Sequence, residues 1–260
     1  MLLAINANNT NTKFALFRDG AMLHEWRILT IAGRTADEYA VWLTQLMRLQ
    51  DCRIEDVDAT IICTVVPQAL FNLRLLCQGY FKSEPLVIGD PKVDLGIKAL
   101  VDRPSEVGAD RLANAVGAHV LFPGKAAVVV DFGTSTNFDV VDEQGNFCGG
   151  IISPGINLSL EALHMATAQL PKIALAKPDK VIGTNTLGCM QSGVFWGYVG
   201  LVEGLVARAK AEWGRPMVVI STGGLAPLFV GATSVIDETA PDITMRGLLQ
   251  IYHTNIRPQA

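Results

Sequence analysis

Residues 126–141 read AAVVVDFGTSTNFDVV, an apolar strand ending in an acidic residue, a small polar turn and a second apolar strand. Residues 4–17 read AINANNTNTKFALF and repeat this pattern near the start of the sequence, about half its length earlier. The two copies align when one extra residue is allowed in the first turn. The repeated strand-turn-strand unit therefore indicates an internal duplication.

The elements predicted after each copy support this duplication. In each half a third strand leads to a helix, and a buried-type strand, a shorter strand and another helix follow. The predicted helices are 36–49, 157–170 and a final one near 243–252, and the later strands are 59–66, 85–89, 216–222 and 234–237. Strands mixed with returning helices predict an α/β fold of two similar halves that face a cleft, with a boundary near residues 115–125.

Composition narrows the class of function. The chain has 260 residues, of which 50% are hydrophobic and 18% charged, so it is long enough for one large or two ordinary globular domains. Its net charge of −4 and scattered basic residues disfavour a nucleic acid or an anionic membrane as partner, and favour a small molecule. With no signal-peptide pattern and no long apolar run, we expect a cytoplasmic protein. Five cysteines without a C-x-x-C pair indicate reduced thiols.

The polar turns suggest a phosphate site. A tight turn of Gly, Ser, Thr and Asn presents backbone N–H groups and hydroxyls, which a polyphosphate needs, and an acidic residue at the strand end can hold Mg²⁺. Asp131, Gly133 and Thr134 fit this description. The alternative is an ordinary hairpin, in which the same residue types are common. Two copies in the same context favour the phosphate site, and the sequence contains no Walker P-loop.

Several segments together resemble a known family. A D-F-G-T turn near the middle of the sequence and a Thr222-Gly223-Gly224 motif resemble the acetate and sugar kinase, Hsc70 and actin superfamily. Within it the protein is similar to type III pantothenate kinases, through residues 104–119, 128–141, 149–163, 182–204 and 221–229. The resemblance implies two duplicated ribonuclease H-like (actin-like ATPase) domains around a central cleft, at residues 1–117 and 118–260, with the last helix able to pack on the first domain.

The same resemblance implies an activity and its partners. It implies ATP-dependent phosphorylation of pantothenate to 4'-phosphopantothenate, the first step of coenzyme A biosynthesis, with Mg²⁺, a monovalent cation (K⁺ or NH₄⁺) and a homodimer. A sugar or acetate kinase is disfavoured because those proteins are usually larger and lack the Gly108-Ala109-Asp110-Arg111 segment.

The resemblance also implies catalytic and binding roles for the residues of this protein that match the family's motifs. Asp110 matches the general base, with a helix cap as its alternative. Gly108, Ala109 and Arg111 match substrate-binding positions, and Arg111 could otherwise form a surface salt bridge. Thr186 matches a substrate contact made across a dimer interface, or caps the helix that follows. The residues expected to bind nucleotide are Asn6, Asn8, Asn9, Thr10, Asn11, Lys13, Asp131, Gly133, Thr134, Gly223 and Gly224, with Asp131 and Asn6 as the metal positions.

The first turn departs from the family pattern. Asn6 stands where the family has Asp and Asn8 where it has Gly, while Asn9 and Thr10 are retained. The first change removes a negative charge expected to favour Mg²⁺, and an amide oxygen coordinates a hard cation more weakly. A catalytically impaired homologue that binds nucleotide or pantothenate is therefore the alternative function.

Four glycines lie on one face of the helix after Thr186. Gly193, Gly197, Gly200 and Gly204 recur at spacings of four, three and four. Each interior helix glycine costs about 1 kcal/mol relative to alanine, so another backbone is expected to pass close to this face. The spacing leaves open whether that neighbour is the protein's own sheet or a partner subunit, and the resemblance favours the partner.

Overall fold

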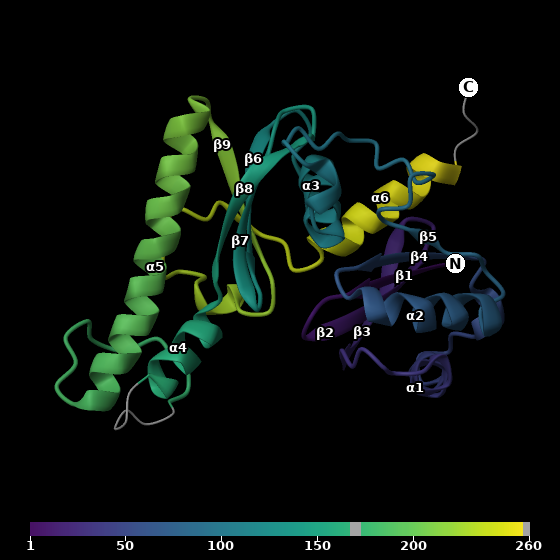
Figure 1. Cartoon of the computed structure of the whole chain (residues 1–260), viewed down its shortest axis with the longest axis horizontal. Helices are drawn as coiled ribbons and strands as arrows, with labels where there is room; N and C mark the ends of the chain where they lie inside the picture. Colours follow the sequence, from purple (N-terminus) through teal and green to yellow (C-terminus); the bar gives the residue numbers. More distant parts are fainter. Residues whose placement is uncertain (167–172, 257–260) are drawn as a thin grey trace. The chain divides into compact units, whose positions relative to one another are not determined.

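The computed structural model describes residues 1–166 and 173–256 (Figure 1). The protein forms two compact units, Met1–Leu121 with Ile243–Ala260, and Phe122–Asp242. Each unit contains a five-stranded sheet with helices, which confirms the predicted α/β fold of two similar halves. No helix among the described residues combines the length and apolarity needed to cross a membrane.

The sheet of the first unit has the strand order β3-β2-β1-β4-β5. β1 pairs antiparallel with β2 and parallel with β4, so it is central and its residues are buried on both faces. The strands are β1 (Leu2–Ala7), β2 (Asn11–Arg18), β3 (Ala21–Leu29), β4 (Ala59–Thr64) and β5 (Leu86–Val87). The helices are α1 (Ala36–Arg48), α2 (Pro67–Gly79), α3 (Ala109–Leu121) and α6 (Ile243–Ile256), with short 3-10 turns η1 (Ile54–Asp56) and η2 (Pro104–Glu106).

The side chains of β1 point alternately to the two faces of the sheet, and each face packs against its own apolar layer. Leu3 and Ile5 pack with residues of α1 and α2, whereas Leu2 and Ala4 pack with residues of α3 and α6. Because successive strand side chains point to opposite faces, Asn6 lies on the face covered by α3 and α6. The period of two in this strand thus decides which helices surround the end of β1.

Two glycines let α3 and α6 cross closely. A Cβ added at Gly247 would lie 1.9 Å from the carbonyl oxygen of Ala113, and one added at Gly117 would lie 2.2 Å from that of Ile243. The Thr244 hydroxyl also donates to Asn114 Oδ1 at 2.6 Å. α6 therefore belongs to the first unit, and α3 continues past the 117/118 boundary expected from the sequence.

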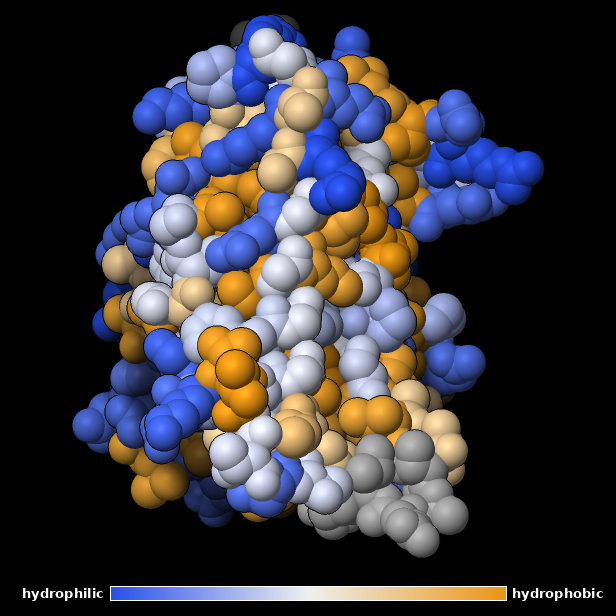
Figure 2. Space-filling view, turned by 90° about the vertical axis from the view of Figure 1, so that its left-hand side faces the viewer, coloured by the Kyte–Doolittle hydropathy of each residue, from blue (hydrophilic) through white to orange (hydrophobic). Residues whose placement is uncertain are grey.

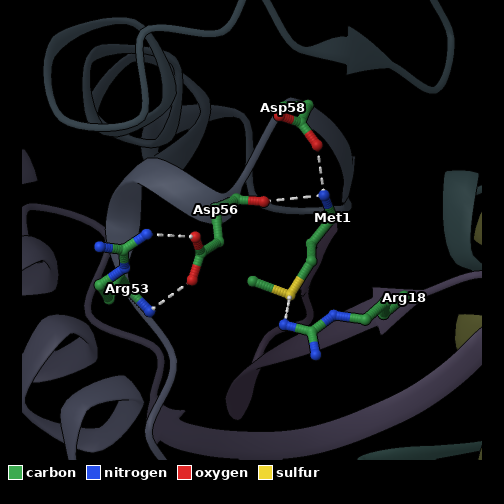
Figure 3. Close-up of polar contacts among 5 residues, drawn as sticks. All are labelled: Met1, Arg18, Arg53, Asp56 and Asp58. Carbon is green, nitrogen blue, oxygen red and sulfur yellow. Dashed lines mark hydrogen bonds and ion pairs between the residues drawn. The ribbon is translucent and has the colours of Figure 1, made fainter.

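A polar network lies at the end of the first sheet where β1 begins (Figure 3). The Met1 amino group donates to Asp58 Oδ2 at 2.5 Å and to the Asp56 carbonyl at 2.8 Å. Arg18 donates to the Met1 sulfur at 3.3 Å, and Arg53 pairs with Asp56 at 3.1 Å. A cavity of about 430 Å³ opens here, lined by the starts of β1 and β4, the β2–β3 turn and α6. The polar turn between β1 and β2 lies at the opposite end of these strands.

The second unit repeats the sheet, with the order β10-β9-β6-β7-β8. β6 pairs antiparallel with β7 and parallel with β9, as β1 does with β2 and β4. The strands are β6 (Ala126–Phe132), β7 (Ser135–Val141), β8 (Phe147–Pro154), β9 (Met217–Thr222) and β10 (Glu238–Thr239). Helices α4 (Ile156–Met165) and α5 (Thr186–Trp213) precede β9, and a 3-10 turn, η3 (Ala226–Leu228), follows it in place of a counterpart to α2.

Two elements of this unit differ in their bounds from the sequence prediction. The helix expected at 157–170 is α4, which runs to Met165; residues 167–170 of that prediction lie outside the described residues. The strand expected near 234–237 is present but begins directly after those residues, as β10 (Glu238–Thr239). The Asp237 N–H donates to the Val219 carbonyl at 2.9 Å and the Asp237 carboxylate accepts the Val219 N–H at 2.8 Å, so Asp237 is bonded to β9 immediately before β10 begins.

Candidate active site

The first polar turn joins β1 to β2. Asn6 faces Lys13 across the hairpin and Cys63 on the parallel strand β4. The Asn8 N–H donates to the Asn11 carbonyl at 3.1 Å, which closes the turn and leaves Asn9 and Thr10 exposed at its tip. The hairpin thus places a buried amide at the strand end and an exposed tip beyond it.

Asn6 and Asn8 each have a buried, unused acceptor. The Asn6 side chain is only 2% exposed, and its Oδ1 atom has no hydrogen-bond partner among the described residues; the Asn8 Oδ1 atom shares this property. A buried acceptor without a hydrogen-bond partner costs about 1–3 kcal/mol of stability, so binding of an external donor or cation to it is favoured. The two oxygens suit a hydrated cation or its bound water.

Asp110 is the second residue of α3. The helix begins at Ala109, and the Gly108 carbonyl accepts the Leu112 N–H at 3.2 Å, so Gly108 rather than Asp110 is at the cap position. Asp110 Oδ1 accepts the Arg111 N–H at 2.8 Å. Burial raises the pKa of the Asp110 carboxyl, against the lowering effects of the Arg111 N–H and charge. A carboxyl with a raised pKa is well suited to accept a proton.

Cys63 lies close both to Asp110 and to the end of β1. The pKa of its buried thiol is raised well above the usual value, mainly by burial and in addition by the negative charge of Asp110. Cys63 is also the parallel neighbour of Asn6. Asn6 and Asp110, two residues predicted to belong to one site, therefore both lie near Cys63 in the first unit.

The second hairpin is equivalent and one residue shorter. Asp131 faces Asn137 in β7 and Thr222 in β9, as Asn6 faces Lys13 and Cys63, and the Gly133 N–H donates to the Ser135 carbonyl at 2.9 Å. The register confirms the one-residue insertion in the first turn and makes Asp131 the structural counterpart of Asn6.

Two glycines approach this hairpin more closely than any side chain would permit. A Cβ at Gly223, where φ is +92°, would lie 2.5 Å from Asp131 Oδ1, and one at Gly155 would lie 2.3 Å from the Thr134 carbonyl oxygen. The Gly155 N–H donates to that carbonyl at 3.0 Å. Gly155 is not among the predicted site residues, although it lies in the 149–163 segment that resembles the family.

Comparison with known proteins shows the family. The sequence model of type III pantothenate kinases matches residues 2–208. Proteins named type III pantothenate kinase from Rhodospirillum rubrum and Paramagnetospirillum magneticum are 59% and 57% identical, over 98% and 99% of this protein and 99% of each relative. This chain belongs to the type III pantothenate kinase family.

Solved structures show the same fold at low identity. A candidate 2-dehydro-3-deoxygalactonokinase from Sinorhizobium meliloti superposes with a TM-score of 0.63 at 12% identity, covering 100% of this protein and 98% of that one. The activator of 2-hydroxyisocaproyl-CoA dehydratase from Clostridium difficile, solved with ADPNP bound, gives a TM-score of 0.54 at 12% identity, over 100% and 98% of the two proteins. The kinase neighbour supports the duplicated actin-like ATPase fold.

Other predicted residues of this family member already have contacts within the protein. Lys13 Nζ lies 3.4 Å from Glu25 Oε1, with both side chains about one quarter exposed. Asn185 rather than Thr186 caps α5, since Asn185 Oδ1 accepts the Gly188 N–H at 2.8 Å, so the capping alternative for Thr186 is wrong. Thr186 itself is exposed at the first position of α5.

The structure thus gathers the predicted residues into two sets, one per unit. The first unit holds the Asn6 hairpin and the start of α3 with Asp110, and the second holds Asp131, Gly133, Thr134 and Gly223. Among the described residues, no three His, Cys, Asp or Glu side chains cluster as a metal site.

Proposed function

We propose that this protein phosphorylates pantothenate with ATP in the cytoplasm, as the first step towards coenzyme A. Membership of the family supports this reaction. The supporting observation in the structure is the Asp110 carboxyl, which lies partly buried at the start of α3 and has a raised pKa. Asp110 accepts the proton of the terminal hydroxyl of pantothenate while that oxygen attacks the γ-phosphorus, and ADP leaves. Arg111 pairs with the substrate carboxylate.

The hairpins bind the nucleotide in this proposal. The Gly133 and Thr134 turn, with Gly223 and Gly224, holds phosphate oxygens, and the first hairpin contributes Asn8, Asn9, Thr10, Asn11 and Lys13. Mg²⁺, when bound with ATP, neutralises phosphate charge. The unpaired Oδ1 of Asn6 accepts a hydrogen bond from its hydration shell or ligates it weakly, and Asp131 holds the monovalent cation.

A coupled assay of ADP release tests the reaction. The purified protein should release ADP only when ATP, Mg²⁺ and pantothenate are all present, and faster with K⁺ or NH₄⁺ than with Na⁺. Asp110→Asn should lower kcat by about 10²- to 10⁴-fold, the usual contribution of a general base. A silent wild type that Asn6→Asp activates would instead support the impaired homologue, whose basis is the missing carboxylate at Asn6.

The glycine face of α5 supports a homodimer. A Cβ added at Gly193, Gly197 or Gly200 would meet no atom of the described residues within 4 Å, so these glycines do not pack on their own sheet. Figure 2 looks at the side of the second unit on which α5 lies in Figure 1, and pale and orange residues run down the middle of this view. A second copy of α5 accounts for glycines that a lone helix would replace by alanine at a gain of about 1 kcal/mol each.

Alanine substitution distinguishes the two states. In a monomer, Gly197→Ala should stabilise the protein; in a dimer with close helix packing, Gly197→Ala and Gly197→Leu should raise the dimer dissociation constant in sedimentation equilibrium. Ala162→Leu, at an exposed position on α4 and away from the glycine face of α5, is the control for added bulk. A monomeric wild type, or a dimer unaffected by Gly197→Leu, would contradict this interface.

A further inference from the structure

A buried hydroxyl network lies directly behind the second hairpin. Tyr198 of α5 is 5% exposed, and its hydroxyl donates to the Pro154 carbonyl at 3.0 Å. Thr136, 1% exposed in β7, is in hydrogen-bond contact with the same Tyr198 hydroxyl. A tyrosine hydroxyl has one hydrogen to give, and Pro154 receives it. Thr136 is therefore the donor to Tyr198, and the hydrogen bonds run from Thr136 to Tyr198 to Pro154.

These contacts close a ring around Thr134. Pro154 is followed by Gly155, whose N–H donates to the Thr134 carbonyl at 3.0 Å. Thr136 is two residues beyond Thr134 on the other side of the turn. Starting at Thr134, the ring runs along the backbone to Thr136, through the Tyr198 hydroxyl to Pro154, and back from Gly155. Tyr198 is the member of this ring that comes from a distant part of the sequence.

Aromatic packing fixes the direction of the Tyr198 hydroxyl. The Tyr198 ring lies 5.8 Å from that of Phe229, and Phe229 stacks on Phe132 with ring centroids 4.6 Å apart. Phe132 directly follows Asp131 and ends β6. The same residue that ties β7 to the start of α4 is thus also packed, through Phe229, against the strand that carries Asp131.

We propose that Tyr198 is a positioning residue for the nucleotide phosphates, acting through the ring that holds Thr134 and Gly155 in place. The inference rests on the proposed kinase function, since it concerns the same phosphate hairpin. It assigns Tyr198 no contact with ATP. Its hydroxyl keeps the Gly133 and Thr134 turn in the conformation that receives phosphate oxygens, and the site of pantothenate is not part of this ring.

Tyr198→Phe removes the hydroxyl and keeps the ring. Removing it leaves the Pro154 carbonyl and the Thr136 hydroxyl unpaired in a buried place, which loosens the turn. We expect the KM for ATP to rise about 5- to 10-fold, with the KM for pantothenate changed less than about 2-fold. Thr136→Val should shift the KM for ATP in the same direction, and Thr136→Ser, which keeps the donor, should behave as wild type.

Tyr39→Phe is the matched control. Tyr39 is fully buried in the first unit, and its hydroxyl has no hydrogen-bond partner among the described residues, so its loss should leave both KM values unchanged. Tyr198→Phe combined with Thr136→Val should be no worse than Tyr198→Phe alone, because both act on one series of hydrogen bonds. Equal KM increases for ATP and pantothenate, or failure of Thr136→Ser to behave as wild type, would overturn the proposal.

Hydrogen exchange tests the ring without relying on catalysis. In Tyr198→Phe, the peptide containing Gly155 should exchange at least about 5-fold faster, because its hydrogen bond to Thr134 opens more often, while peptides from α1 are unchanged. If the wild type lacks kinase activity but this exchange effect is present, the proposed function fails and the ring stands. Unchanged exchange at Gly155 would overturn the positioning role whatever the activity.

Discussion

Asn6→Asp places a carboxylate at the end of β1, where the resemblance to the family leads us to expect one. Asn6 is 2% exposed and its Oδ1 atom has no hydrogen-bond partner among the described residues, so the new carboxylate would be buried with one oxygen left without a partner. Lys13 is the residue across the hairpin, but its ammonium already lies 3.4 Å from Glu25 Oε1, so the protein supplies little compensation. The new charge therefore needs an added cation.

The substitution Asn6→Asp should have two opposite effects, a loss of stability without Mg²⁺ and a gain in affinity for Mg²⁺. Without Mg²⁺, an unpaired buried carboxylate should lower the free energy of unfolding by about 1–3 kcal/mol. With Mg²⁺ and ADP, affinity for the cation should rise about 10- to 100-fold, by analogy with metal sites that lose or gain a supporting carboxylate. That affinity gain corresponds to about 1.4–2.7 kcal/mol of added stabilisation at saturating cation.

Urea unfolding of wild type and Asn6→Asp, each with ADP and either EDTA or a series of Mg²⁺ concentrations, measures both effects. The difference between the Mg²⁺ and EDTA stabilities should be larger in Asn6→Asp, and the Mg²⁺ concentration for half-maximal ADP release should fall about 10- to 100-fold. Gln45→Glu, at an exposed position on α1, adds the same charge as a control and should respond like wild type. Equal Mg²⁺ stabilisation of wild type and Asn6→Asp would refute the reasoning.

Three further predictions concern other parts of the site. Because the pKa of Asp110 is raised in the folded protein, its charged form destabilises the fold above that pKa, and the effect disappears below the unfolded value of about 4. Asp110→Asn should thus be slower by about 10²- to 10⁴-fold yet more stable than wild type at about pH 8, with the stability difference vanishing at acid pH in urea unfolding. The wild-type kcat/KM should fall with acid at a pKa above about 4. Gly223→Ala, which places a Cβ 2.5 Å from Asp131 Oδ1 at positive φ, should destabilise by about 1–3 kcal/mol and raise the KM for ATP, whereas Gly224→Ala, with no atom of the described residues within 4 Å, should cost less stability in the same melts. Gly247→Ala, 1.9 Å from a carbonyl of α3, should destabilise by about 1–3 kcal/mol or more and reduce kcat, because α3 carries Asp110; a fully stable, active variant would contradict the close crossing.

The parts of the fold that the sequence predicts well are those decided by local pattern. The duplicated hairpins are confirmed residue by residue, since Asn6 and Asp131 occupy the same register position, and α1 begins and ends within a residue of its predicted bounds. The family is confirmed because its motifs run along most of the sequence. Strand period and turn composition are properties of neighbouring residues, so they can be seen without a structure.

The parts that local pattern misses depend on contacts between distant segments. Gly155 belongs to the second hairpin only because α4 begins against Thr134, and no local pattern records that approach. The strand expected near 234–237 begins at Glu238, and the Asp237 side chain accepts the Val219 N–H. Asn185 rather than Thr186, for which capping is the alternative role, caps α5, and both are good capping residues. In the last two cases a side-chain oxygen takes a hydrogen bond that the sequence pattern assigns elsewhere.

The duplicated hairpins differ at the residue that follows the parallel neighbour of Asn6 or Asp131. Thr64 stands at the register position that Gly223 occupies in the second unit, and its hydroxyl donates to the Ala7 carbonyl at 3.1 Å. At Gly223 no side chain fills that space, and the backbone instead lies close to the Asp131 carboxylate. The Thr64 hydroxyl thus ties β4 to the end of β1 in the first hairpin, whereas in the second the Asp131 carboxylate lies where a side chain at position 223 would be.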